Sequence, residues 1–164
     1  MPTAVVTGAN GGVGLAFAKK LIEEGYTVYA CDIKVGDEMQ KLKTKYVHQL
    51  DVTSPSSMSS FAGEFRSQPL DLLLNVAGIM PTKSADSLAT VSLDSLTKTF
   101  SVNTFGPLLL TQALIPALLK SSSSKVANVS SRVGSIADNL TGGAYAYRAS
   151  KAALNAISKS MSVD

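Results

Sequence analysis

Tyr147 and Lys151 are the two residues whose types and spacing best suit acid–base chemistry. Residues four apart on a helix lie on one face and within reach of each other. A free tyrosine ionises only at about pH 10, but a neighbouring ammonium favours the phenolate and brings proton transfer closer to neutral pH. Tyr145 has no lysine four residues further on, so Tyr147 is the better candidate. Taken alone, the pair also fits two ordinary helix residues.

A second candidate for chemistry is the glycine-dense turn at residues 7–14, Thr-Gly-Ala-Asn-Gly-Gly-Val-Gly. The apolar run Ala4–Val6 leads into the turn, and a helical pattern that stops at Gly25 leaves it. Glycines let backbone N–H groups approach a pyrophosphate closely, and a helix N-terminus adds partial positive charge. The order strand, glycine turn, helix therefore predicts a phosphate cradle; a tight turn without a ligand is the alternative. The helical pattern puts these residues on one apolar face: Val13, Ala16, Phe17 and Leu21.

An acidic residue, Asp32, ends the apolar, β-rich run 27–31, just over twenty residues after the glycine turn begins. A carboxylate there can accept hydrogen bonds from both ribose hydroxyls of an adenosine. It would repel a 2′-phosphate, which favours NAD over NADP as the ligand. Lys34 lies close enough to weaken that discrimination, and a solvated aspartate at the start of a loop is the alternative.

Strands and helices are expected to alternate along the chain. The expected strands are 4–6, 27–31, 46–50, 71–74 and 125–129. The expected helices are 13–24, a short one within 36–45, 53–65, 88–103 continuing through 107–120, and 144–161. This alternation predicts an α/β fold, a doubly wound parallel sheet with ligands at the carboxyl ends of its strands. Because 107–120 is apolar on nearly every side, we expect the sheet to cover one of its faces and a subunit partner the other.

These elements together resemble the short-chain dehydrogenase/reductase family. Four segments carry the resemblance: T-G-x-x-x-G-x-G at Thr7, Gly8, Gly12 and Gly14; N-[NAS]-A-G at Asn75–Gly78; V-N-x-x-G at Val102–Gly106; and Y-x-x-x-K at Tyr147–Lys151, after the strand-end pair Ser130-Ser131. The resemblance implies a Rossmann-type sheet of strand order 3-2-1-4-5, in a single dinucleotide-binding domain over residues 1–164. It also implies hydride transfer between a nicotinamide and a small or mid-sized alcohol or carbonyl substrate.

The resemblance assigns roles residue by residue. Tyr147 is the proton donor or acceptor at the substrate oxygen, and Lys151 assists it and holds the nicotinamide ribose. Ser131 hydrogen-bonds the substrate oxygen, with Ser130 as the rival for that role, and Asn103 supports a proton relay through water to Lys151. The residues expected to bind the cofactor are Gly8, Asn10, Gly11, Gly12, Val13, Gly14, Asp32, Asp51, Val52, Asn75, Ala77, Gly78, Tyr147 and Lys151. The expected cofactor is NAD, with NADP possible.

The chain ends at Asp164, whereas family members normally continue into a sixth strand, a Pro-Gly element, a substrate lid and a seventh strand. Two functions therefore compete. The first, which Ser131, Tyr147 and Lys151 favour, is a C-terminally truncated oxidoreductase. The second is a catalytically weak dinucleotide-binding or interaction module. For either function we expect a homodimer or homotetramer, built through the helices at 94–120 and 144–163.

Composition and charge argue against several other functions. A net charge of +3 carried by scattered lysines, without a basic run interleaved with aromatics, disfavours nucleic acid as a partner. Cys31 is the single cysteine, which excludes an intrachain disulfide, and the single His48 leaves no metal-ligand spacing. The N-terminus leaves no room for a signal peptide before the first strand, and the longest apolar stretch, 107–119, is too short to span a bilayer. The expected location is the cytoplasm, with no membrane partner.

Overall fold

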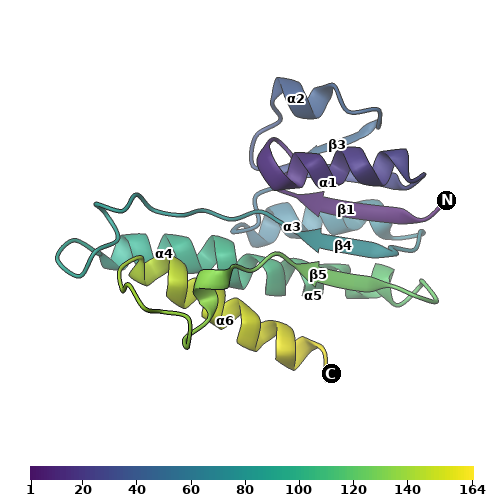
Figure 1. Ribbon diagram of the computed structural model, residues 1–164. Helices are drawn as coiled ribbons and strands as arrows, with labels where there is room; N and C mark the ends of the chain where they lie inside the picture. The colour runs from purple at the N-terminus through teal and green to yellow at the C-terminus, as the bar shows by residue number, and fades with distance from the viewer. The chain divides into compact units, whose positions relative to one another are not determined.

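Five parallel strands form one sheet in the order β3-β2-β1-β4-β5, the order that the family resemblance implies (Figure 1). The computed structural model describes all residues from 1 to 164. The strands are β1 (Thr3–Thr7), β2 (Thr27–Asp32), β3 (Tyr46–Gln49), β4 (Leu72–Asn75) and β5 (Lys125–Asn128). The central strand β1 pairs with β2 on one side, at Val5 opposite Tyr29, and with β4 on the other, at Val5 opposite Leu73.

The chain folds as two compact units, the first made of 1–77 and 109–129, the second of 78–108 and 130–164. The first unit holds the sheet, α1 (Gly12–Glu23), α2 (Asp37–Gln40), α3 (Pro55–Ala62) with the short 3₁₀ turn Gly63–Phe65, and most of α5 (Gly106–Leu118). The second unit holds α4 (Leu93–Phe100), the π-helical segment Ser101–Phe105, the first residues of α5, a 3₁₀ turn at Arg132–Gly134, and α6 (Tyr145–Met161). The expectation of a single domain over 1–164 stays a prediction.

The core of the first unit covers both faces of the central strands. Every residue of β1 is buried, and so are the four inner residues of β2, as expected of parallel strands covered on both faces. Helices α1 and α3 lie on opposite faces of the sheet (Figure 1). The cluster on one face comprises Ala4, Val6, Ala9, Ala18, Leu21, Val28, Ala30, Met39, Leu42 and Leu74. On the other face, Tyr29 stacks on Tyr46 with ring centroids 4.2 Å apart.

The predicted apolar face of the first helix is wrong in part. Leu21 is buried, but Val13 is 56% exposed and Phe17 is 39% exposed. Instead, Gly14 and Ala18 accompany Leu21 on the buried face of α1. Small residues at these positions let the helix backbone approach its neighbours closely, so packing distance outweighs side-chain hydrophobicity in choosing the face.

The predicted helix at 88–103 begins later than expected, at Leu93. Ser92 caps α4 by accepting a hydrogen bond from Ser95 N at 3.1 Å. Before the cap, the Thr90 hydroxyl contacts the Ser87 hydroxyl at 2.7 Å and donates to the Ser84 carbonyl at 2.6 Å. Such local side-chain bonds offer the backbone an alternative to a helix, which explains why 84–91 folds as turns.

Cys31 and His48, the single cysteine and the single histidine, both pack against other residues of the fold. Cys31 is buried, and this burial, with a smaller contribution from the Asp32 carboxylate, raises the pKa of its thiol. His48 stacks on Tyr29 and meets Phe61 edge-on, with ring centroids 5.5 and 5.4 Å apart.

The structure contains no group of three His, Cys, Asp or Glu side chains that could hold a metal ion. None of its helices combines the length and the apolar character needed to span a membrane.

Candidate active site

The glycine turn between β1 and α1 approaches other backbone so closely that side chains are excluded. Gly8 has φ +68°, and a Cβ on it would lie 2.9 Å from Ala77 N. A Cβ on Gly14 would lie 2.1 Å from the Gly8 carbonyl oxygen. Since an alanine at either position would strike backbone, the spacing of these two glycines is required by the shape of the turn. Gly11 and Gly12 are open, with nothing within 4 Å of a Cβ built on either of them.

Hydrogen bonds tie the glycine turn to the end of β2. Asn10 N donates to the Asp32 carboxylate at 3.0 Å, and Asn10 Oδ1 accepts from Gly36 N at 2.9 Å. The structure thus brings Asn10 and Asp32, both predicted to bind the cofactor, into direct contact. The other Asp32 oxygen accepts only the longer bond from Lys34 N at 3.5 Å, which leaves it with acceptor capacity for a ligand hydroxyl.

Thr7 joins the end of β1 to the end of β4, a role that sequence reasoning missed. Its buried hydroxyl oxygen accepts from Val76 N and from Ala77 N, both at 3.0 Å. The only signal for this role was the threonine that opens the T-G-x-x-x-G-x-G pattern. Next to it, the Asn75 amide donates to Asn128 Oδ1 at 2.8 Å, across β4 and β5.

Asp51 and Val52 follow β3. One oxygen of the Asp51 carboxylate accepts from the Thr53 amide at 2.8 Å and from the Thr53 hydroxyl at 2.7 Å. The side chain of Val52 is buried. The bonds to Thr53 shape the turn into α3, so the structure gives Asp51 a local role in addition to its predicted role in cofactor binding.

In the second unit, Asn103 is fully buried in the π-helical segment between α4 and α5. Its Oδ1 accepts from Ile79 N at 2.8 Å, and its Nδ2 donates to the Ile79 carbonyl at 2.8 Å and to Ser150 Oγ at 3.0 Å. Ser150 Oγ in turn donates to the Tyr147 carbonyl at 2.8 Å. Asn103 therefore links Ile79, the residue after Gly78, to the helix that carries Tyr147. A π-helical turn of this kind is common at functional positions, and no sequence motif indicated it.

Tyr147 and Lys151 both lie on α6, four residues apart. Lys151 is only 4% exposed, and this burial lowers the pKa of its ammonium. Burial disfavours the charged form because the protein replaces water around it. The backbone around Lys151 is also held in place, since Ser130 Oγ donates to the Lys151 carbonyl at 3.4 Å and a Cβ on Gly134 would lie 3.0 Å from Lys151 Cβ.

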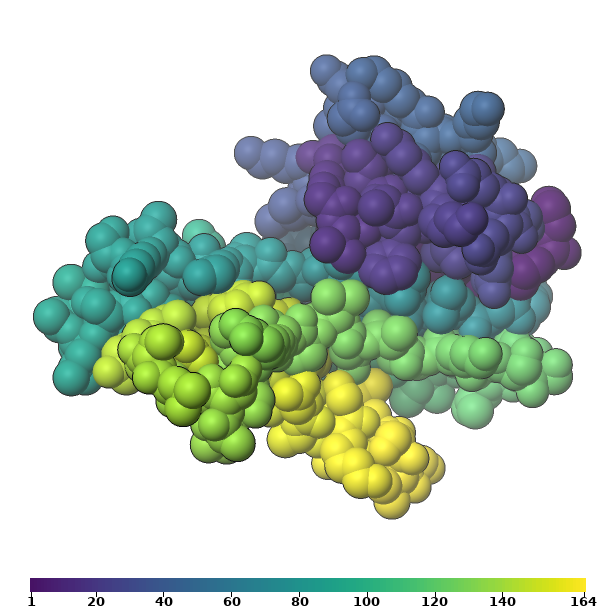
Figure 2. Space-filling model, in the orientation of Figure 1, coloured from purple at the N-terminus to yellow at the C-terminus, as the bar shows by residue number.

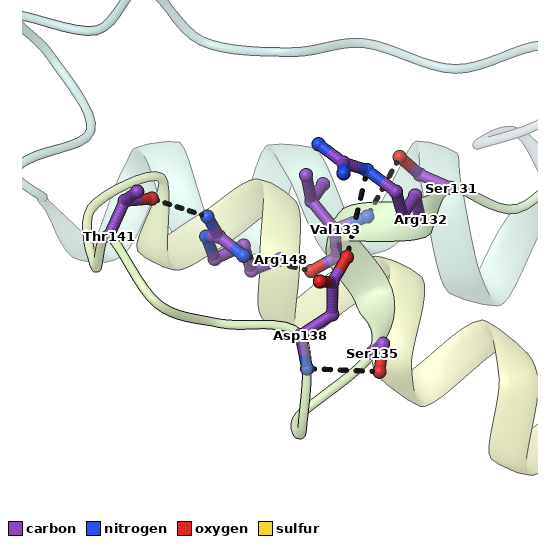
Figure 3. A network of polar contacts seen from close by, with 7 residues as sticks. All are labelled: Ser131, Arg132, Val133, Ser135, Asp138, Thr141 and Arg148. Carbon is purple, nitrogen blue, oxygen red and sulfur yellow. Dashed lines mark hydrogen bonds and ion pairs between the residues drawn. The ribbon is translucent and has the colours of Figure 1, made fainter.

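The loop that begins at Ser131 is fastened to α6 by Arg148, a second residue that sequence reasoning missed (Figure 3). Arg148 donates to the Val133 carbonyl at 3.4 Å and to Thr141 Oγ1 at 3.1 Å. Ser131 Oγ itself accepts from Val133 N at 3.4 Å. The loop therefore lies against the start of α6, as Figure 2 also shows. Within the loop, Arg132 and Asp138 form an ion pair at 3.6 Å.

The predicted residues thus fall into two sets. The first unit contains the glycine turn and the ends of β2, β3 and β4, with Gly8, Asn10, Asp32 and Asn75 among them. The second unit contains Gly78 and the four predicted catalytic residues, Asn103, Ser131, Tyr147 and Lys151. Ser131 and Ser130 differ in their contacts, since only Ser130 bonds to α6.

Known proteins resemble this chain in both sequence and fold. The chain matches the short chain dehydrogenase family over residues 2–164. It is 33% identical over 159 residues to 1-hydroxy-2-glutathionyl-2-methyl-3-butene dehydrogenase of Rhodococcus sp. (strain AD45), covering 96% of this chain and 68% of that protein. It is 45% identical over 107 residues to C-signal of Myxococcus xanthus, covering 65% of this chain and 63% of that protein.

Among solved structures, NADPH-bound carbonyl reductase from chicken fatty liver is 34% identical, with a TM-score of 0.87 over 99% of this chain and 73% of that one. This chain spans about two thirds of the length of the two curated relatives. By its sheet order, its motifs and its match over nearly every residue, the chain belongs to the short-chain dehydrogenase/reductase family of oxidoreductases.

Proposed function

We propose that this chain is a nicotinamide-dependent oxidoreductase that interconverts a small or mid-sized alcohol and its carbonyl compound. The observation that carries the proposal is the pair on α6: a tyrosine four residues before a lysine that is buried and whose pKa is lowered by that burial. A buried lysine beside a phenol is costly as a purely structural feature. It is useful where a proton must move at neutral pH.

The glycine turn fits a dinucleotide. Gly8 and Gly14 exclude Cβ atoms where backbone comes closest, and the open positions Gly11 and Gly12 precede the N-terminus of α1. The pyrophosphate would be held by this turn, and the adenosine ribose by the Asp32 oxygen that accepts only the long bond from Lys34 N. When bound, a nicotinamide dinucleotide supplies or accepts the hydride.

The chain's own residues move the proton and hold the substrate. The Tyr147 hydroxyl gives a proton to the substrate oxygen during reduction and takes it back during oxidation. The Lys151 ammonium stabilises the phenolate and donates to ribose hydroxyls. Ser131 Oγ donates to the substrate oxygen, where charge develops in the transition state. By the family resemblance, Asn103 supports a proton relay through water to Lys151.

Between the two cofactors, the carboxylate of Asp32 favours NAD, because a 2′-phosphate would meet like charge. The chicken carbonyl reductase binds NADPH, so family membership alone does not choose between them. The choice is made by the charge at the end of β2, which a comparison of NADH and NADPH measures directly.

The test begins with fluorescence titration of the 164-residue chain with NADH and with NADPH, followed by a screen of carbonyl compounds for NAD(P)H oxidation. Tyr147→Phe is expected to lower kcat by about 100- to 10,000-fold, the range of general acid–base catalysis, with cofactor affinity nearly unchanged. Tyr145→Phe removes a tyrosine hydroxyl two residues earlier in the same helix and is the matched control. Cofactor binding without turnover would favour the binding-module function, and absence of binding would overturn both.

We also propose that the chain forms a homodimer or homotetramer through the helices at 94–120 and 144–163. On α5, Leu109 and Ile115 remain 39% and 44% exposed. Exposed apolar side chains on a helix that is apolar on nearly every side are typical of a surface that a partner covers. Analytical ultracentrifugation of the wild type and of Ile115→Lys tests this, and an unchanged monomer for both would contradict it.

A further inference from the structure

Asp86 is a buried carboxylate that reaches α6 from a distant part of the chain. It is only 2% exposed and lies in the second unit, within the turns that precede α4. One oxygen accepts from Ala146 N at 2.8 Å and the other from Tyr147 N at 3.2 Å. The Asp86 backbone carbonyl also accepts from Ala144 N at 2.9 Å. Asp86 thus receives three N–H groups from four consecutive residues.

The start of α6 needs such a partner from elsewhere. The first N–H groups of a helix have no carbonyl within the helix to pair with, and a Ser, Thr, Asp or Asn at the N-cap usually supplies the acceptor. The N-cap of α6 is Ala144, which has no such side chain and whose φ is +50°, in the left-handed region. Asp86 takes the place of the missing cap, and its charge suits the positive end of the helix.

The carboxylate of Asp86 has no cationic partner, since no Lys, Arg or His forms an ion pair with it. Its burial is therefore compensated by the backbone of α6. A buried charge that is satisfied in this way fixes the geometry of its donors, because any displacement leaves it unpaired. The donors here include the amide of Tyr147 itself.

We propose that Asp86 is a positioning residue for Tyr147: it fixes the first turn of α6 and so the backbone from which the phenol extends. The inference rests on the proposed function for its catalytic consequence, but not for its structural one. Lys151 lies one turn further along, where bonds within the helix and the contacts of Ser130 and Gly134 hold it. Loss of Asp86 should therefore disturb Tyr147 far more than Lys151.

The experiment compares Asp86→Ala, Asp86→Asn and the wild type, with Asp94→Ala as the matched control. Asp94 is also an aspartate near a helix N-terminus of the second unit, but it is exposed and lies in the first turn of α4. Asp86→Asn keeps an oxygen acceptor and removes the charge, so it serves if Asp86→Ala fails to fold. Amide hydrogen exchange and the ring signal of Tyr147 are followed by NMR, and kcat, KM and the cofactor dissociation constant are measured on the same samples.

For Asp86→Ala we expect exchange at Ala146 and Tyr147 to be at least ten times faster, with exchange at Leu154 little changed. We expect kcat to fall about tenfold or more and the cofactor dissociation constant to stay within twofold. The exchange rates and kcat of Asp86→Asn should lie between those of Asp86→Ala and the wild type. Unchanged exchange at Ala146 and Tyr147 would overturn the inference. So would faster exchange with unchanged kcat, because Asp86 would then be only structural.

The two proposals fail in different ways. If the wild type shows no turnover, the proposed function is wrong, and the positioning role is decided by the Tyr147 ring signal. A ring signal in Asp86→Ala that moves toward the position of an unstructured tyrosine supports the inference, and one that stays in place contradicts it. Asp94→Ala should leave every one of these measurements unchanged.

Discussion

Replacing Gly14 with alanine improves helix propensity but brings an added Cβ into a steric clash. We expect the clash to have the larger effect on the stability of the fold. Alanine is favoured over glycine inside a helix by about 1 kcal/mol. The added Cβ, however, would lie 2.1 Å from the carbonyl oxygen of Gly8 and 2.6 Å from its carbonyl carbon. Both atoms belong to backbone, so no side chain can rotate away and the turn or the helix must shift.

The magnitude follows from these two opposing effects. Overpacking a well-packed site costs about 1–3 kcal/mol, sometimes more, and a contact this short with backbone belongs at the upper end. After subtraction of the gain in propensity, Gly14→Ala should lose about 2 kcal/mol of stability. In a chain of this size that corresponds to a drop in Tm of about 4–8 °C. Affinity for NADH should fall as well, because the turn that cradles the pyrophosphate is displaced.

Gly63→Ala is the matched control. Gly63 has φ −57° and ψ −29°, which alanine adopts without strain, and the nearest atom to its added Cβ is 4.0 Å away. Here the same substitution should leave stability unchanged or raise it by about 0.4–1 kcal/mol. Thermal unfolding by circular dichroism measures both variants. A Tm for Gly14→Ala at or above that of the wild type would refute the reasoning that close backbone contact fixes this glycine.

Three further predictions concern Thr7, Lys151 and Asp32. Thr7→Val should lower the free energy of unfolding by about 1–3 kcal/mol in urea, because two backbone amides at the end of β4 lose their acceptor; Thr7→Ser should retain it, and equal losses would contradict this. Burial lowers the pKa of Lys151 from its ordinary 10.5, so between the two values the unfolded chain binds more protons and stability rises with pH. Lys151→Met should remove that rise when Tm is followed from about pH 7 to pH 10. Asp32→Asn keeps an acceptor for the amide of Asn10 but loses the charge, so the ratio of NADPH to NADH affinity should increase about tenfold; an unchanged ratio would exclude Asp32 as its determinant.

Much of the fold could be predicted from local patterns. The alternation of apolar strands with helices predicts the doubly wound sheet, and the resemblance predicts its strand order, which the structure confirms. The starts of two helices show how far local patterns predict where an element begins. The helix expected from residue 53 begins close to that position, at Pro55 after the cap Ser54. The helix expected from residue 88 begins only at Leu93, because hydroxyl groups upstream bond locally.

The predicted site residues came from motifs whose geometry is set by neighbours in the sequence. The glycine turn is of this kind, since its conformation is set by a few consecutive residues. So is the pair Tyr147 and Lys151, since residues four apart on a helix lie on one face. Their assigned roles stay predictions until the cofactor and activity measurements are made.

What only the tertiary structure decided involves partners far apart in the chain. Thr7 meets the amide of Ala77 across 70 positions, and Asp86 meets the amide of Tyr147 across 61. Which face of α1 is buried was likewise decided by the backbone that Gly14 approaches. The sequence by itself determined the glycine turn and the spacing of Tyr147 and Lys151, because the geometry of each motif depends on residues adjacent in the chain. Burial and long-range pairing depend on which segments the fold brings together, and no local pattern contains that information.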